Sequence, residues 1–289
     1  MAGALVSHKK HKMNYCEIRP RYPLSRFVEC FWTLEGNKPS SDPERILPDG
    51  CVELILNFGA EFLQHKDERR ELQPRNFLVG QMTGPILISP TGSVQLIGIR
   101  FHPGGTAPFL RLPLHEITDQ VVELGSLASK LERDLLRVSS VAASLTEKIR
   151  ELEEFLTREL LSRETDPRLM TLAARIVDSG GLVSVDQLAN DAGISSRQLE
   201  RRFLREIGLG PKLLGRIIRF QQVFRAVEQC DAAWAAVAIE CGYYDQAHLI
   251  RDFHQFARQT PAVLFGHPSA LTESFTRKAR KSDFYNTIG

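Results

Sequence analysis

The C-terminal half contains two short segments in which arginine, glutamine and histidine stand opposite a row of apolar residues. If each segment is an α-helix, Leu199 and Phe203 mark the buried side of the first, and Leu249 and Phe253 mark that of the second. Arginine pairs with guanine, and glutamine with adenine, through two hydrogen bonds each. The predicted DNA contacts are therefore Ser196, Arg197, Glu200, Arg201 and Arg205 in the first segment and Gln246, His248, Arg251 and Gln255 in the second.

These segments belong to a sequence repeat with an offset of about 50 residues. The copies are LANDAGISSRQLERRFLREIGLGP over 188–211 and VAIECGYYDQAHLIRDFHQFARQTP over 237–261. In each copy a glycine, Gly193 or Gly242, can adopt the left-handed conformation that ends a helix. A polar residue follows, Ser195 or Asp245, which can cap the next helix. This order predicts two helix-turn-helix units, in which the second helix reads the major groove.

The segment 211–228 joins the two copies, and its apolar stripe predicts a buried helix of roughly 25 Å. Such a helix could hold two recognition helices in successive major grooves, which lie about 34 Å apart. Between positions 197 and 225 there are eight lysines and arginines but only two acids. Phosphate contacts need such a local excess of positive charge. The net charge of the whole chain, +2, gives no such indication.

Residues 166–265 resemble the DNA-binding domain of the AraC/XylS family of bacterial regulators, and GYYDQAHLIRDFHQF over 242–256 is especially close to the family signature. The resemblance implies a seven-helix domain that binds promoter DNA through both units. It places base contacts at Arg197, Glu200 and Arg201 and at Gln246, His248 and Arg251. Two positions depart from the family pattern: Arg258 replaces a frequent glycine, and Gly210 replaces a serine or threonine. Both departures affect the expected loop geometry rather than the fold.

The N-terminal half has the pattern of short strands between turns. Runs of β-favouring residues at 51–58, 77–80, 86–88 and 94–101 predict an antiparallel sandwich or barrel. The charged segment 67–73 predicts a solvated loop, and the first 15 or so residues predict a loose arm.

Several N-terminal segments, among them RILPDGCVELILNFG and IGIRFHPGG, resemble a sensor domain that accompanies this regulator family. Such domains are commonly cupin-like β-barrels that bind small effectors. Trp32, Glu53 and Arg100 are the predicted effector contacts, because pockets combine aromatic side chains with a few charged groups. The alternatives are that Trp32 belongs to the core and that Arg100 is a surface or ion-paired residue.

The predicted fold is two-domain α+β, with a β-rich N-terminal domain and an all-α C-terminal domain. The β-rich sensing domain covers 16–125, helices cover 126–162, the double helix-turn-helix domain covers 163–267, and a loose tail covers 268–289. Leucines at three- and four-residue steps leave two alternatives for 126–162: packing on the sensor domain or on a second subunit. Asp166 is the expected N-cap of the next helix, with Pro167 as its first residue.

Enzyme chemistry has little support in the sequence. The five cysteines have no CxxC spacing and no signal peptide precedes them, so buried thiols and a cytoplasmic location are expected. His65, His102 and His115 lack the close pairing that a metal site in a barrel would need. No catalytic motif and no run of about 18 apolar residues occurs. The sequence therefore predicts no enzyme, no cofactor and no metal.

The predicted partners are double-stranded promoter DNA and a small-molecule effector, with RNA polymerase and a second copy of the chain as further candidates. No membrane partner is expected. A metal-dependent cupin-type enzyme fused to a DNA-binding anchor is the alternative, and a protein that binds DNA without sequence preference is another.

Overall fold

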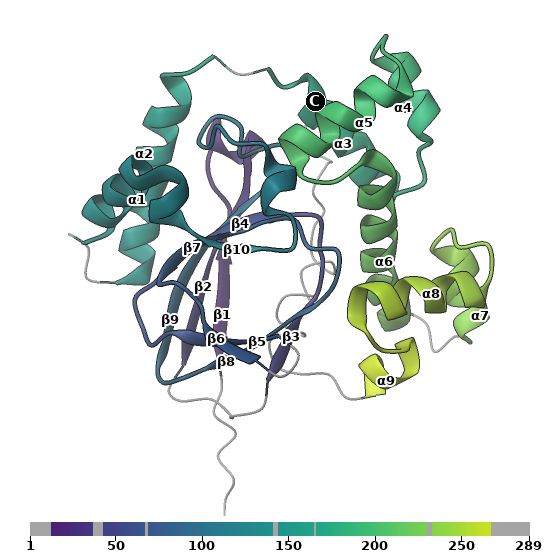
Figure 1. Cartoon of the computed structure of the whole chain (residues 1–289), viewed down its shortest axis with the longest axis horizontal. Helices are drawn as coiled ribbons and strands as arrows, with labels where there is room; N and C mark the ends of the chain where they lie inside the picture. The colour runs from purple at the N-terminus through teal and green to yellow at the C-terminus, as the bar shows by residue number, and fades with distance from the viewer. Residues whose placement is uncertain are drawn as a thin grey trace, which may run out of the picture.

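A computed structural model describes residues 13–36, 43–66, 69–140, 144–164, 166–229 and 233–266. The predicted tail 268–289 and Cys230 lie outside these residues. The β-rich N-terminal part and the helical C-terminal part lie side by side (Figure 1), which confirms the predicted fold class. Among the described helices, none is both long and apolar enough to cross a membrane.

The N-terminal domain consists of two antiparallel sheets. The larger sheet has the order β1 (Asn14–Ile18), β2 (Val28–Gly36), β9 (Val94–Phe101), β4 (Val52–Asn57), β7 (Asn76–Val79) and β10 (Val121–Glu123). The smaller sheet has the order β3 (Glu44–Ile46), β8 (Ile86–Pro90), β5 (Phe62–Lys66) and β6 (Arg69–Leu72). The four predicted strands correspond to β4, β7, β8 and β9.

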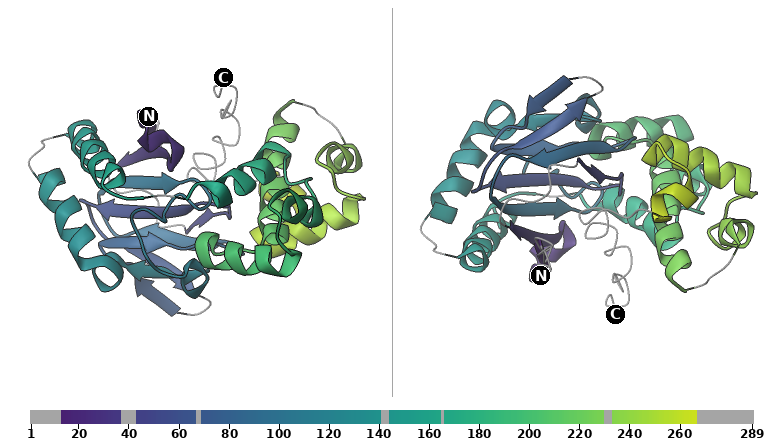
Figure 2. Two further views of the ribbon diagram at one scale, coloured as in Figure 1. Left: turned by 90° about the horizontal axis from the view of Figure 1, so that it is seen from above. Right: turned by 90° about the horizontal axis from the view of Figure 1, so that it is seen from below.

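Both faces of the larger sheet are buried, because successive side chains on a strand point to opposite faces. On one face, Phe31 and Ile99 join a core with leucines of α1 (Leu124–Ser140) and α2 (Leu145–Leu161). On the other face, Trp32 and Leu96 join a second core with Phe62 of the smaller sheet. The leucine-rich helices thus pack on their own domain, on the side away from the C-terminal helices (Figure 2).

The charged segment 67–73 does not form the predicted loop throughout. Its residues Arg69–Leu72 form β6, an exposed strand that pairs with β5. Charged residues are compatible with a strand there, because β6 is an edge strand whose side chains all face solvent. Lys66 and Glu71 form an ion pair of 2.8 Å across this hairpin.

The C-terminal domain contains α3 (Arg168–Asp178), α4 (Val185–Asp191), α5 (Ser196–Ile207), α6 (Pro211–Gln229), α7 (Trp234–Glu240), α8 (Gln246–Ala257) and α9 (Pro261–Gly266). These helices share one core, with Phe220 of α6 stacked edge-on against Phe253 of α8 at 4.8 Å. The first helix begins one residue later than expected, at Arg168. The carboxylate of Asp166 still accepts a hydrogen bond from the Arg168 backbone N–H, at 3.1 Å.

Candidate DNA-binding surface and ligand pocket

The first helix-turn-helix unit consists of α4 and α5. Gly193 between them has a φ of +64°, and Ser195 caps α5 in a capping box with Gln198, as the sequence predicts for both residues. Leu199 and Phe203 are fully buried, so the opposite side of α5 faces outward.

The predicted contacts on α5 divide into two groups. Arg197, Arg201 and Arg205 are exposed, and none of them forms an ion pair within the described residues. Ser196 instead donates a hydrogen bond of 2.8 Å to Asp186, which ties α5 to α4. Glu200 is exposed and lies over the backbone of the α5–α6 turn.

The Glu200 carboxylate lies close to Gly210. A Cβ at Gly210 would lie 2.1 Å from this carboxylate, which is the end of a flexible, exposed side chain and can move away. The Gly210 carbonyl still accepts the first backbone hydrogen bond of α6, from Leu214 at 3.0 Å.

The second helix-turn-helix unit consists of α7 and α8. Gly242 has a φ of +75°, and the Asp245 side chain accepts a hydrogen bond of 2.6 Å from the His248 N–H, so the predicted turn and cap are confirmed. Gln246 and Arg251 are exposed. His248 is half-buried, with its ring edge-on to Tyr243 at 5.1 Å.

One of the predicted DNA contacts, Gln255, forms a contact inside the domain. Gln255 accepts a hydrogen bond of 2.6 Å from Arg216 of α6. Arg216 also pairs with Asp252, whose side chain is only 1% exposed, at 2.6 Å. Arg219 donates to the carbonyls of Gly242 and Gly181 at 3.4 and 3.3 Å. Part of the local excess of positive charge therefore stabilises the domain rather than facing solvent.

Arg258 adopts the conformation that glycine would adopt at its position. It ends α8 with a φ of 54°, in the left-handed region. The departure from the family pattern therefore leaves the turn unchanged and adds backbone strain.

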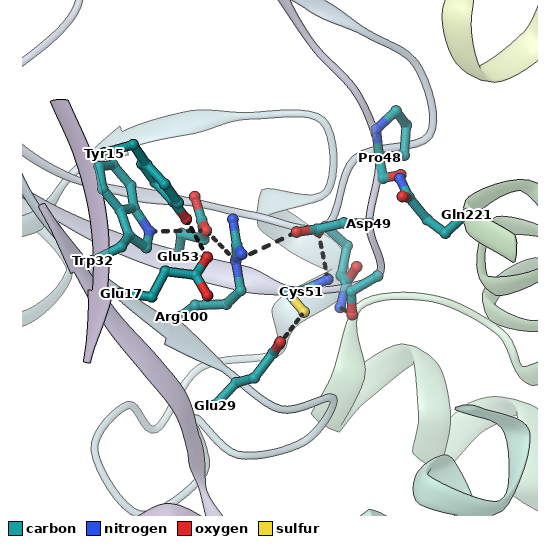
Figure 3. A network of polar contacts seen from close by, with 12 residues as sticks. Tyr15, Glu17, Glu29, Trp32, Pro48, Asp49, Cys51, Glu53, Arg100 and Gln221 are labelled. Carbon is teal, nitrogen blue, oxygen red and sulfur yellow. Dashed lines mark hydrogen bonds and ion pairs between the residues drawn. The ribbon is translucent and has the colours of Figure 1, made fainter. Parts of the chain in front are cut away.

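The N-terminal domain has a pocket between its two sheets, where the predicted effector contacts meet (Figure 3). The Trp32 indole donates a hydrogen bond of 3.1 Å to Glu53, and Arg100 pairs with the same carboxylate. All three lie on one face of the larger sheet, on β2, β4 and β9. A Cβ at Gly98 would lie 1.9 Å from the indole, so glycine on β9 makes the room that Trp32 occupies.

Asp49, which the sequence did not mark as an effector contact, belongs to the same polar group. Asp49 Oδ2 lies 3.4 Å from Arg100 Nε, and Oδ1 accepts a hydrogen bond of 2.9 Å from the Cys51 backbone. Burial raises the pKa of Asp49 to about 6, and the nearby Glu53 adds to the rise while Arg100 opposes it. The Pro48-Asp49-Gly50 turn was visible in the sequence, but its proximity to Arg100 was not.

Most of the pocket wall is apolar. About 850 Å³ of empty space lies inside it, counted out to where it opens to solvent. The apolar lining residues are Trp32, Leu34, Ile46, Leu47, Ile55, Phe62, Phe77, Val79, Met82, Ile86, Ile88 and Leu96. The polar lining residues are Asp49, Cys51, Glu53, Gln73, Arg100 and Gln221. A mostly apolar wall with a few polar groups is typical of small-molecule sites.

Helix α6 contributes one wall of this pocket. Gln221 lines it and donates a hydrogen bond to the Pro48 carbonyl (Figure 3). Leu47 packs into the core of the C-terminal domain, and a Cβ at Gly50 would lie 3.0 Å from Leu214 of α6. The segment 47–51 therefore lines the pocket and also contacts α6.

The three histidines considered for a metal lie on different elements. His65 is on β5 and shares a hydrogen bond of 2.8 Å with Ser89, while His102 follows β9 and His115 lies in the 3-10 helix Leu114–Ile117. No group of three or more potential metal ligands occurs among the described residues.

Two protein-family models match the sequence. Residues 188–267 match a helix-turn-helix domain, and residues 16–123 match a domain of unknown function, DUF6597. No curated protein matches the chain in sequence.

Solved structures with a related arrangement are distant. A structure of ToxT from Vibrio cholerae is 10% identical, with 90% of this chain and 100% of that chain covered and a TM-score of 0.42. ToxT with a bound unsaturated fatty acid is 10% identical, with 88% and 94% covered and a TM-score of 0.40. The AraC-like transcriptional activator CuxR is 13% identical, with 77% and 82% covered and a TM-score of 0.27.

The matched helix-turn-helix domain begins within α4 and includes α5, α6, α7 and α8, and thus both recognition helices and the helix between the units. The chain thus carries a DUF6597 domain over residues 16–123 and an AraC-type helix-turn-helix domain over residues 188–267, which is the DNA-binding domain of transcription regulators.

Proposed function

We propose that the chain binds specific promoter sequences through α5 and α8 and that a small molecule in the N-terminal pocket controls this binding. The observation that carries the proposal is the pair of exposed, arginine-bearing recognition helices at the two ends of α6 (Figure 1). The site of action is promoter DNA in the bacterial cytoplasm.

The spacing of the two units supports simultaneous contact with one duplex. Helix α6 has 19 residues, which corresponds to about 28 Å at 1.5 Å per residue. Successive major grooves lie about 34 Å apart, so two units anchored at its ends suit adjacent turns of one face. In this arrangement Arg197 and Arg201 on α5, and Gln246 and Arg251 on α8, contact base edges.

The remaining candidate residues have other roles in the proposal. Arg205 contacts phosphate, and Glu200 and His248 lie at the margins of the two base-reading surfaces. Ser196 and Gln255 hold the recognition helices in place through Asp186 and Arg216.

Contacts between the domains support control by a ligand. Thr118 donates a hydrogen bond of 2.8 Å to the Gly208 carbonyl at the end of α5. Near the end of α8, a Cβ at Gly84 would lie 3.7 Å from the Gln255 carbonyl. The sensor domain thus bonds to the end of α5 and approaches the end of α8, so a ligand that favours one docked arrangement changes how both helices meet DNA.

The test begins with selection of bound genomic fragments by the purified protein. Arg251→Ala weakens binding to the operator found in this way by about 1–3 kcal/mol, and it reduces the preference for this operator over random DNA. Arg133→Ala, at an exposed position on α1, is the matched control and leaves the affinity unchanged. Equal affinity of Arg251→Ala and the unmodified chain for the operator contradicts the assignment, and equal binding of operator and random DNA contradicts sequence-specific recognition.

A further inference from the structure

We infer that the N-terminal pocket takes an apolar molecule with a cationic head, such as an amine, and that Asp49 and Glu53 bind this head. The inference rests on the pocket of the proposed function and names the chemical class of its ligand.

The first support is the charge of the pocket wall. The charged residues that line it are Asp49, Glu53 and Arg100, which makes two carboxylates for one guanidinium. Glu29 lies just behind, where it accepts a hydrogen bond of 3.3 Å from the Cys51 thiol. The polar end of the pocket is therefore net negative, and it attracts a cation and repels an anion.

The second support is the orientation of the charged groups. Arg100 is 3% exposed, and its Nε contacts both carboxylates, so these two groups already compensate its positive charge. In Glu53, Oε1 accepts from Trp32 and Arg100, while Oε2 has no hydrogen-bond partner among the described residues. Asp49 keeps 26% of its side chain exposed. Both carboxylates therefore retain acceptor capacity for a donor that enters the pocket.

The third support is the cost of the buried charge without a ligand. Burial raises the pKa of Asp49 to about 6, so its carboxylate is insufficiently compensated by Arg100. An ammonium group beside it would supply the missing counter-charge. The aromatic rings of Trp32, Phe62 and Phe77 in the same wall suit both an apolar body and a neighbouring cation.

The bound head would also lie close to the C-terminal domain. Both sequence neighbours of Asp49 lie against α6. Gly50 lies close to Leu214, and the Pro48 carbonyl accepts a hydrogen bond from Gln221. An ion pair with Asp49 thus acts directly on the segment that contacts the linker helix.

Three probes with one body and different heads test the inference: 4-phenylbutylamine, 4-phenylbutan-1-ol and 4-phenylbutanoate. The chain has two tryptophans, so Trp234→Phe leaves Trp32 as the single fluorescent reporter of the pocket. We expect the amine to bind about tenfold more tightly than the alcohol at pH 7.5, because charge-assisted hydrogen bonds are stronger than neutral ones. The carboxylate binds more weakly than the alcohol.

Asp49→Asn keeps an oxygen for the Cys51 N–H and removes the charge, so the amine-to-alcohol affinity ratio falls towards one. Glu53→Gln lowers the amine-to-alcohol affinity ratio in the same way, and it replaces Asp49→Asn in the test if that variant does not fold. Glu71→Gln, on the exposed strand β6, is the matched control and keeps the ratio of the unmodified chain.

The outcomes separate the two proposals. The cationic ligand class is wrong if 4-phenylbutanoate binds as tightly as 4-phenylbutylamine, or if both pocket variants keep the amine-to-alcohol affinity ratio of the unmodified chain. Either result still leaves the pocket as a ligand-binding site. If none of the three probes changes Trp32 fluorescence in folded protein, the inference and the ligand-binding part of the proposed function are both overturned. The operator selection tests the DNA-binding part independently.

Discussion

Replacing Asp252 with alanine removes the carboxylate that holds α8 against α6. Asp252 is 1% exposed and contacts Arg216 at 2.6 Å through Nη2 and 3.2 Å through Nε. Arg216 also lies over the Phe256 ring at 5.2 Å and donates to Gln255. The pair is thus the polar centre of the contact that orients the second recognition helix.

The expected loss of stability follows from the burial of the two partners. Removing one partner of a fully buried ion pair costs roughly 3–5 kcal/mol, because the other charge is left without compensation. Arg216 keeps 29% of its side chain exposed and can regain water, so the cost for Asp252→Ala lies at the lower end, about 3 kcal/mol.

Urea unfolding followed by Trp234 fluorescence, in a Trp32→Phe background, measures this loss in the C-terminal domain. The matched control is Asp191→Ala in the same domain. Its ion pair with Arg175 leaves the two side chains 45% and 36% exposed, so less than about 1 kcal/mol is expected. Equal effects of the two substitutions would refute the reasoning that burial makes the Arg216–Asp252 pair a major structural contact.

Three further predictions concern single positions. Gly98→Ala displaces the Trp32 indole, and a changed Trp32 emission maximum in the Trp234→Phe background checks this; an unchanged maximum contradicts the contact. Arg258→Gly relieves the left-handed backbone strain and raises the unfolding free energy by about 0.5–1 kcal/mol, as measured in urea titrations. A lower unfolding free energy would show that the Arg258 side chain stabilises the fold by more than the strain destabilises it. The pKa of Asp49 rises from 3.8 to about 6 on folding, so the unfolded state loses this proton first as the pH rises. The unfolding free energy of the unmodified chain, relative to that of Asp49→Asn, therefore falls between pH 4 and 6 by at most about 3 kcal/mol. Urea titrations at several pH values check the sign.

Local chemistry explains which features the sequence predicted. Gly193, Ser195, Gly242 and Asp245 act on neighbouring residues through turns and caps, so their roles are visible in a short stretch of sequence. The strand β9 was predicted for a similar reason, since its β-favouring residues are consecutive.

Contacts between distant segments explain what the sequence did not predict. The Gln221 side chain reaches the Pro48 carbonyl across 173 positions, and no local pattern marks either residue as a partner of the other. The same holds for Gln255 and Ser196, whose exposed positions on an isolated helix suggested DNA contacts. Their bonds to Arg216 and Asp186 arise only when the helices pack together.

Because one uninterrupted helix separates the two units, its length also sets their rotational phase. An insertion of one residue in α6 would turn the second unit by about 100° while moving it only about 1.5 Å. The second unit would then point away from the face of the duplex that the first one reads. An insertion or deletion in α6 therefore keeps both units on one face of the duplex only if it adds or removes a nearly whole number of helical turns. The length of α6 thus also limits the distance between the two half-sites of an operator.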